Sequence, residues 1–257
     1  MNVGTFVHRQ HVRSHDVAAV VLAAGAGRRM EAAINKVFLL VGGKPILARS
    51  LELFQGLRQV EQIAVVCAAG ELGVARSQVI EPYELAKVSN LVVGGETRHH
   101  SEYLGIQSLV PEIESRVVNI VLVHDAVRPF VSPDVLAELI TEARRSGAAI
   151  PAVRAGEDIV SVDTDGRLEP RAGDLWVAQT PQAFDARLLL AAHRRAEAEG
   201  FIGTDTASVV ERTGHVVRVV PGRYDNIKLT TSDDLVLAEQ IATWQVHVTP
   251  EQGMLHV

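Results

Sequence analysis

Val17-Ala-Ala-Val-Val-Leu22, closely followed by Gly25-Ala-Gly27, is the stretch that decides the fold of this 257-residue chain. An unbroken apolar run without alternation is typical of a strand that is covered on both faces, at the centre of a parallel sheet. Similar apolar runs recur at 63–67, 90–93, 117–123 and 148–153. Each is short enough for a buried strand, so the sequence predicts a sheet built from these segments.

Helix-like stretches lie between these runs, at 47–54, 101–109 and 133–145. The third begins Ser132-Pro133-Asp134, a capping residue followed by proline at the first helical position. Strand and helix therefore alternate through about the first 150 residues, which predicts an α/β sandwich of βαβ units. Further along the chain we expect helices at 188–192, 207–210 and 233–244, and a strand at 216–220.

The segment from Glu157 to Asp174 breaks this alternation. Charged residues separate short β-branched pieces there, and Asp165-Gly166 is a β-hairpin signal. We expect a β-arm at about 155–175 that leaves the sheet; such arms often reach a neighbouring subunit. The expected organisation is a flexible leader at 1–15, one domain at 16–245 that includes the arm, and a flexible tail at 246–257.

Composition excludes several classes of protein. A net charge of −6 gives no overall basic surface, so no nucleic acid is expected as a partner. No apolar run approaches the roughly 20 residues that a membrane-spanning helix needs, and the leader lacks the apolar stretch of a signal peptide. A single cysteine, Cys67, rules out an internal disulfide framework. These features favour a cytoplasmic location.

The glycine turn after the first strand predicts a phosphate-binding loop. Gly25 and Gly27 allow close approach of the backbone to a ligand, and a helix starting after them would direct its N–H groups at phosphate. Arg28 and Arg29 add positive charge at the same place. A dinucleotide site is a weaker interpretation, because Met30 stands where its third glycine belongs. A plain strand–helix turn is the remaining alternative.

Three charged residues extend this prediction. Lys36 could fold back over the phosphates and offset charge on a transferring phosphoryl group. Asp125 follows the run at 117–123 and could hold Mg²⁺ or accept a hydrogen bond from a substrate hydroxyl, although a turn residue is the simpler alternative. Lys228 lies between apolar neighbours as if in an apolar strand, where its ammonium needs an anion or water.

Other polar residues are more ambiguous. Gly94-Gly95 offers bare backbone N–H and C=O groups that can bind the edge of a base. Ser101 has two interpretations, a ligand-binding group or simply a helix cap. His124 is expected to be a packed structural residue, and Cys67 an inert core residue.

Taken together, these segments resemble the 2-C-methyl-D-erythritol 4-phosphate cytidylyltransferase family over about 17–244. The family's motifs occur in order: Ala-Ala-Gly-x-Gly-x-Arg-Met at 23–30, Gly-Gly-x-x-Arg-x-x-Ser at 94–101, His-Asp-Ala-x-Arg-Pro at 124–129, Gln-Thr-Pro-Gln-x-Phe at 179–184, Thr-Asp-x-Ala-Ser at 204–208 and Asn-Ile-Lys-x-Thr at 226–230. The resemblance implies a Rossmann-like, mostly parallel sheet sandwiched by helices, with a protruding β-arm exchanged in a homodimer. It also implies Mg²⁺-dependent transfer of CMP from CTP to methylerythritol phosphate, with release of pyrophosphate, in isoprenoid biosynthesis.

The resemblance assigns a role to each matching residue. It implies that the catalytic residues are Arg29, Lys36 and Lys228. It implies that the nucleotide is bound by Ala23, Ala24, Gly25, Gly27, Gly95, Glu96 and Ser101. It implies that methylerythritol phosphate is positioned by Asp125, Arg128, Arg171 and Thr180, with Arg171 supplied by the arm of a partner subunit, and that Asp125 contacts the metal. Mg²⁺ itself would be bound chiefly through the CTP phosphates.

Several positions depart from the family's usual pattern. Asn35-Lys-Val-Phe38 replaces Pro-Lys-Gln-Tyr, Glu157-Asp-Ile-Val160 replaces Asp-Thr-Ile-Lys, and one extra residue separates Arg171 from Trp176. These departures leave two alternatives open: a cytidylyltransferase for another polyol phosphate, such as ribitol 5-phosphate, and a catalytically silent nucleotide-binding protein.

Overall fold

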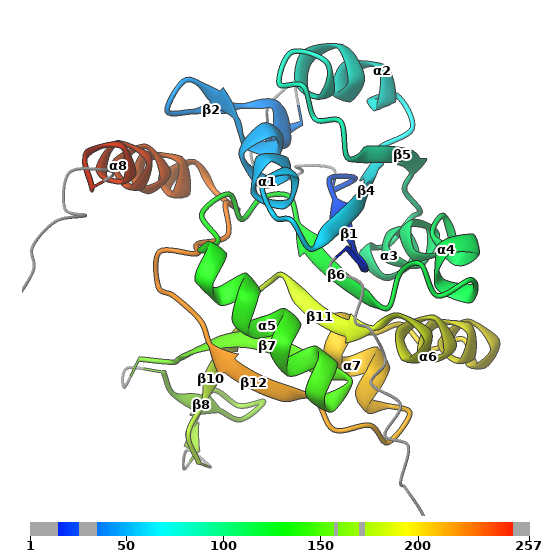
Figure 1. Cartoon of the computed structure of the whole chain (residues 1–257). Coiled ribbons are helices and arrows are strands. Elements are labelled where there is room, and N and C mark those ends of the chain that lie inside the picture. The colour runs from blue at the N-terminus through cyan, green and yellow to red at the C-terminus, as the bar shows by residue number, and fades with distance from the viewer. Residues whose placement is uncertain (1–14, 26–34, 157–158, 170–172, 249–257) are drawn as a thin grey trace, which may run out of the picture.

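The computed structural model describes residues 15–25, 35–156, 159–169 and 173–248 (Figure 1). In chain order its strands are β1 (Val17–Leu22), β2 (Leu40–Val41), β3 (Lys44–Pro45), β4 (Val60–Cys67), β5 (Val88–Val93), β6 (Ile120–Asp125), β7 (Ala148–Arg154), β8 (Ser161–Val162), β9 (Leu168–Glu169), β10 (Trp176–Ala178), β11 (Gln182–Asp185) and β12 (Arg218–Pro221). Its helices are α1 (Ile46–Gln55), α2 (Leu72–Ala75), α3 (Arg98–Gln107), α4 (Val110–Glu114), α5 (Pro133–Ser146), α6 (Ala186–Glu199), α7 (Thr206–Glu211) and α8 (Ser232–Val248), with a 3₁₀ turn η1 (Lys36–Phe38) and a π-helical turn η2 (Arg76–Ile80).

The main sheet has β1 near its centre. Its strand order is β10-β7-β11-β6-β1-β4-β5, and β12 pairs with β7. Strand β1 is parallel to both neighbours, with Leu22 opposite Val66 on β4 and opposite Asp125 on β6. Only β10 and β11 run against the other strands of this sheet. The mostly parallel α/β sheet is therefore confirmed.

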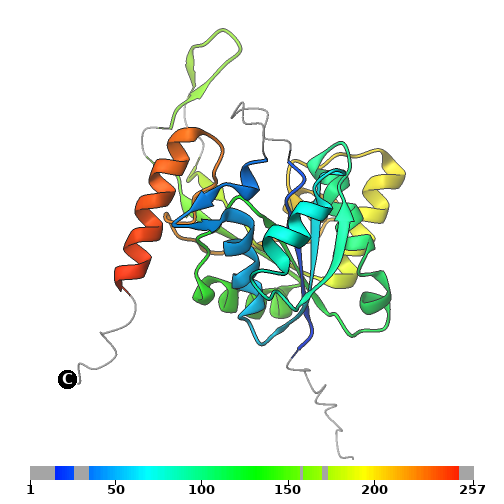
Figure 2. The same ribbon diagram turned by 90° about the horizontal axis from the view of Figure 1, so that it is seen from above.

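Both faces of β1 are covered, as its uninterrupted apolar run predicts. Val17, Ala19 and Val21 point into a core shared with α1, α5 and α8. Ala18 and Val20 point into a second core shared with α3, α4, α6 and α7. The helices thus form a layer on each side of the sheet (Figures 1 and 2). Burial on both faces explains why this strand carries no polar alternation.

Local capping fixes where several helices begin and end. Ser132 caps α5 by accepting a hydrogen bond from the N–H of Asp134, and Gly147 ends that helix with a φ of 87°. Asp205 and Ser208 form a capping box at the start of α7. These helix starts agree with the sequence prediction.

Other boundaries differ from prediction. Helix α3 begins at Arg98, three residues before the expected start, because Thr97 caps it. Strand β6 occupies 120–125 rather than 117–123: the N–H groups of Val117 and Val118 bond to the carbonyl of Glu112, and Asp125 joins the ladder opposite Leu22. Helix α8 continues to Val248, beyond the expected tail boundary at 246.

The segment from 222 to 231 forms no strand, so the strand expected around Lys228 is wrong. It contacts the turn that follows β6 instead, where the N–H of Leu229 donates to the carbonyl of Val127. Strands β10 and β11 were not predicted. With three residues in β10 and four in β11, both are too short for an apolar pattern to indicate a strand.

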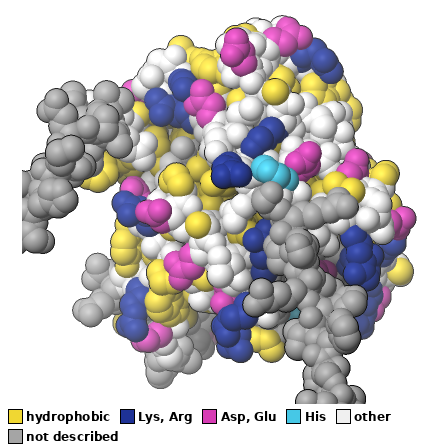
Figure 3. Space-filling view, viewed as in Figure 1, with side chains coloured by type: hydrophobic (Ala, Val, Ile, Leu, Met, Phe, Trp, Pro, Cys, Tyr) yellow, Lys and Arg dark blue, Asp and Glu magenta, His cyan; other side chains and the backbone are white. Residues whose placement is uncertain are grey.

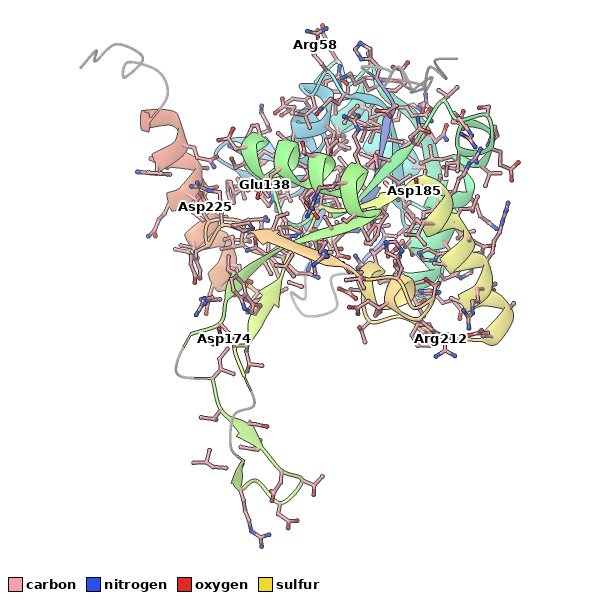
Figure 4. All side chains as sticks on the ribbon, turned by 60° about the horizontal axis from the view of Figure 1, so that its bottom comes forward. Arg58, Glu138, Asp174, Asp185, Arg212 and Asp225 are labelled. Carbon is pink, nitrogen blue, oxygen red and sulfur yellow. The ribbon has the colours of Figure 1, made fainter. Side chains whose placement is uncertain are left out.

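The arm between β7 and β10 contains the expected hairpin. Strands β8 and β9 pair antiparallel around a turn in which Gly166 has a φ of 79° and the carboxylate of Asp163 accepts the N–H groups of Asp165 and Arg167. Figure 4 shows the arm projecting from the body of the molecule beyond the labelled Asp174. None of the described helices is long and apolar enough to cross a lipid bilayer.

Helix α3 packs closely on the sheet at Gly105. A methyl group there would lie 2.5 Å from Val20 Cγ1 and 2.8 Å from Val66 Cγ2. We predict that Gly105→Ala lowers the free energy of unfolding by about 1–3 kcal/mol, the usual cost of overpacking. The matched control is Gly73→Ala in α2, where a methyl group meets nothing within 4 Å; it should be neutral or stabilising by up to ~1 kcal/mol. Equal urea midpoints for the two variants would contradict this packing.

Candidate active site

A cavity of about 550 Å³ opens where the carboxyl ends of β1, β5 and β6 meet. Such edges are where α/β sheets bind ligands, and the volume suits a small molecule. Nine residues that the sequence analysis selected line it: Ala23, Ala24, Gly25, Lys36, Gly95, Glu96, Ser101, Asp125 and Lys228. The fold therefore brings into one cavity residues that lie more than 200 positions apart in the sequence.

The glycine segments after β1 and β5 are in close contact. A methyl group on Gly94 would lie 2.4 Å from Ala24 Cβ and 2.9 Å from Ser101 Oγ, so only glycine allows the two segments to approach. Ser101 is not the cap of α3. Its hydroxyl accepts the N–H of Gly95 at 3.1 Å and fixes the loop whose backbone faces the cavity.

Lys36 is held beside this glycine segment by its neighbour Asn35. The side chain of Asn35 caps η1 by accepting the N–H of Val37, and its amide donates to Glu71 Oε2 at 2.8 Å and to the carbonyl of Ala23. Val37 is buried, which anchors the turn in the core. The hydrogen bonds of Asn35 therefore anchor the segment that presents Lys36 to the cavity.

The carboxylate of Asp125 pairs with two positively charged side chains. Arg98 Nε donates to its Oδ1 at 3.0 Å and Lys228 Nζ donates to its Oδ2 at 2.7 Å. Burial alone would raise the pKa of the Asp125 carboxyl, but the charges of Arg98 and Lys228 outweigh burial and hold that pKa well below its usual range. Asp125 is thus an anion throughout the physiological pH range, and it joins the start of α3 to the segment before α8.

Behind Asp125, a hydrogen-bonded chain fixes its backbone. The N–H of Asp125 donates to Thr180 Oγ1, which lies 3.1 Å from His124 Nδ1, while His124 Nε2 lies 3.2 Å from the carbonyl of Arg128. Since that carbonyl can only accept, the proton of His124 is on Nε2, and Nδ1 accepts the Thr180 hydroxyl proton. His124 is wholly buried, and burial lowers its pKa to about 3. It is a structural residue, as expected.

Two other expected substrate contacts, Arg128 and Thr180, lie behind the cavity lining rather than on it. Thr180 is buried, and Arg128 Nη1 donates to the carbonyl of Asn226 at 2.8 Å. Asn226 in turn donates to the carbonyl of Thr180 at 3.0 Å. These bonds fasten the segment that carries Lys228. Gly27, Arg29 and Arg171 lie outside the described residues.

Arg98 is a charged residue of the cavity for which the sequence predicted no role. It lies on the cavity lining and bonds to both Asp125 and Glu102. Recognising Thr97 as the cap would have revealed such a role: Arg98 is then the first residue of α3, where the helix dipole disfavours a cation. An arginine at that position needs specific anionic partners. Cys67, by contrast, is buried as expected, and burial raises its pKa to about 12.

A glycine segment and convergent lysines at the carboxyl edge of such a sheet define the class of the α/β nucleotidyltransferases. Comparison with known families narrows this class. Residues 17–243 match the family model IspD, 2-C-methyl-D-erythritol 4-phosphate cytidylyltransferase. The chain belongs to this family, which confirms the resemblance seen in its motifs.

Individual relatives agree with this assignment. A 2-C-methyl-D-erythritol 4-phosphate cytidylyltransferase of Geobacter metallireducens is 46% identical over 225 residues, covering 87% of this chain and 96% of that protein. The crystal structure of the 4-diphosphocytidyl-2C-methyl-D-erythritol synthase of Anaerococcus prevotii matches with a TM-score of 0.77 and 28% identity, over 90% of this chain and 97% of that one. The cytidylyltransferase structure from Thermus thermophilus has a TM-score of 0.67 and 32% identity, over 89% and 99%.

The buried, neutral His124 predicts a dependence of stability on pH. Its folded pKa of about 3 lies below the value of about 6.5 in the unfolded chain, so its contribution is complete above pH 6.5 and is lost as the pH falls towards 3. We predict that His124→Asn, which cannot titrate, lowers stability at pH 7 but reduces the loss between pH 6.5 and 4.5 by up to ~1.4 kcal/mol per pH unit. Urea unfolding in EDTA measures both slopes, and equal slopes would refute the prediction.

Proposed function

We propose that this chain transfers CMP from CTP to 2-C-methyl-D-erythritol 4-phosphate and releases pyrophosphate. The names of its relatives describe them as cytidylyltransferases of this polyol phosphate. One observation carries the proposal: a single cavity combines a bare glycine segment and Lys36 with the Lys228–Asp125–Arg98 cluster. The glycine segment with Lys36 suits a triphosphate, and the cluster, which we propose as the acceptor side of the cavity, suits a second, hydroxyl-bearing anion.

In the proposed reaction, a phosphate oxygen of the polyol phosphate attacks the α-phosphorus of CTP. A new P–O bond forms there, the bond to the β-phosphate oxygen breaks, and pyrophosphate leaves with the electron pair. Lys36, together with Arg29, would offset the charge that develops on the α-phosphate. Gly95, Glu96 and Ser101 would orient the nucleoside, while Asp125 and Lys228 would orient the acceptor. Orientation and charge stabilisation are what phosphoryl transfer requires most.

A divalent cation fits this cavity mainly as a partner of the substrate phosphates. Asp125 and Glu96 supply carboxylate oxygens at the lining, the donors that Mg²⁺ prefers. Both oxygens of Asp125 already bind cations, and the part of the chain that the structure describes holds no cluster of three or more metal-ligating side chains. We therefore propose that the CTP phosphates carry most of the Mg²⁺ coordination, with Asp125 contacting it. Bound there, Mg²⁺ would neutralise triphosphate charge.

The direct test is pyrophosphate release with defined acceptors. We expect release from CTP and Mg²⁺ with methylerythritol 4-phosphate, and much slower release with ribitol 5-phosphate. Rapid release with ribitol 5-phosphate alone would overturn the acceptor assignment. Binding of CTP without release for either acceptor would instead indicate a catalytically silent nucleotide-binding protein.

We also propose that a second copy of the chain covers the β-arm. Val160, Val162 and Leu168 leave large apolar side chains exposed on a two-stranded hairpin, and an isolated hairpin of this size is marginally stable in water. Arg154 stacks on Trp176 at the base of the arm, where its guanidinium lies 5.3 Å from the ring. On the face shown in Figure 3, hydrophobic side chains lie among acidic and basic ones. In such a homodimer Arg171 would reach the partner's cavity.

The arm proposal predicts the effect of a charge on the hairpin. Leu168 is 73% exposed, so Leu168→Glu should fold normally but weaken the dimer, because burying a leucine contributes about 1.5–3 kcal/mol. Ile202→Glu is the control: Ile202 is 65% exposed and lies between α6 and α7, and the variant should remain dimeric. Sedimentation equilibrium measures both. A monomeric wild type, or equal dimer affinities for the two variants, would contradict the proposal.

A further inference from the structure

A buried carboxylate lies behind the cavity and takes no part in its lining. Glu102 on α3 is 1% exposed, and His193 on α6 is wholly buried. Glu102 Oε1 accepts a hydrogen bond from His193 Nε2 at 2.9 Å, and Glu102 Oε2 accepts one from Arg98 Nη1 at 2.8 Å. Both oxygens of this carboxylate are therefore engaged, one toward the cavity and one toward the core.

Arg98 connects this buried carboxylate to the cavity. Its Nη1 donates to Glu102, while its Nε and Nη2 both lie 3.0 Å from Asp125 Oδ1. Asp125 in turn accepts from Lys228 at 2.7 Å. Lys228, Asp125, Arg98 and Glu102 thus form a series of ion pairs with charges of alternating sign. The hydrogen bond from His193 to Glu102 completes the network.

The buried end of this chain is held rigidly. The ring of His193 stacks between two other rings: its centroid lies 5.0 Å from that of His99 and 5.8 Å from that of Tyr103. The planes of the His193 and Tyr103 rings differ by 5°. Helix α3, which carries Arg98 and Glu102, is fixed on the sheet by the close contact of Gly105 with Val20. An arginine anchored on two sides has a fixed guanidinium plane, whereas one with a single partner can rotate.

A buried carboxylate is costly to fold unless it is fully paired, and the hydrogen bonds of Glu102 lead to Arg98 on one side and to His193 on the other. We propose that Glu102 and His193 are positioning residues that fix Arg98, and through it Asp125 and Lys228, for the acceptor substrate. This inference rests on the proposed cytidylyl transfer. It predicts an effect on the acceptor side of the cavity and not on the glycine segment that faces CTP.

The test compares steady-state constants for both substrates in the full-length protein. Glu102→Gln keeps the shape of the side chain and removes its charge; His193→Leu removes the Nε2 donor. We expect each to lower kcat/KM for methylerythritol phosphate by about 10–100-fold, the usual effect of misplacing a substrate, while the KM for CTP changes less than about threefold. The two changes should not be additive, because they act on one network. His193→Gln keeps a donor and should restore part of the loss.

Leu189→Ala is the control for stability. Leu189 is buried on α6, and its truncation should lower the unfolding midpoint without changing either substrate's constants. Wild-type constants in folded Glu102→Gln and His193→Leu, or an equal change in both substrates' KM that Leu189→Ala reproduces, would overturn the proposal. If Glu102→Gln does not fold, the His193→Leu and His193→Gln pair decides by the same criteria. Wild-type turnover, measured first, tests the proposed function separately.

Discussion

The cavity depends on the ion pairs that Asp125 makes with Arg98 and Lys228. These three residues come from the start of α3, the end of β6 and the segment before α8, and their pairing brings together elements that the chain separates by more than 100 positions. Surface ion pairs contribute little, but the side chain of Asp125 is only 10% exposed. If its charge were removed, Arg98 and Lys228 would be left as neighbouring like charges, and the acceptor side of the cavity would lose its arrangement.

The fold makes this pairing possible through backbone features that carry no chemistry themselves. Parallel pairing of β1 with β6 places Leu22 opposite Asp125. Gly94 allows the two ligand-facing loops to touch, and the Thr180–His124 chain fixes the backbone of Asp125. Each of these features fixes the position of either the Asp125 carboxylate or the glycine segment, so that both lie in one cavity.

Much of this could be predicted from the sequence where a local pattern determines the outcome. The strand at 17–22 follows from its apolar run, and the start of α5 from Ser132 and Pro133. The role of Arg98 could not be derived in this way. Its pair with Glu102 is local, four positions along the same helix, but Asp125 lies 27 positions away and meets Arg98 only in the folded chain. Lys228 was placed in a strand because its neighbours are apolar, whereas hydrogen bonds from Asn226 and Arg128 hold its segment without one.

The most direct measurement is steady-state kinetics of Asp125→Asn, with CTP binding measured by calorimetry. Asparagine keeps the size of the side chain but cannot balance Arg98 and Lys228. If the pairing organises the acceptor side, kcat/KM for methylerythritol phosphate falls by about 100-fold or more, while CTP affinity is retained. Glu142→Gln, which breaks a surface pair with Arg145, should change neither. An unchanged kcat/KM in Asp125→Asn would contradict the account.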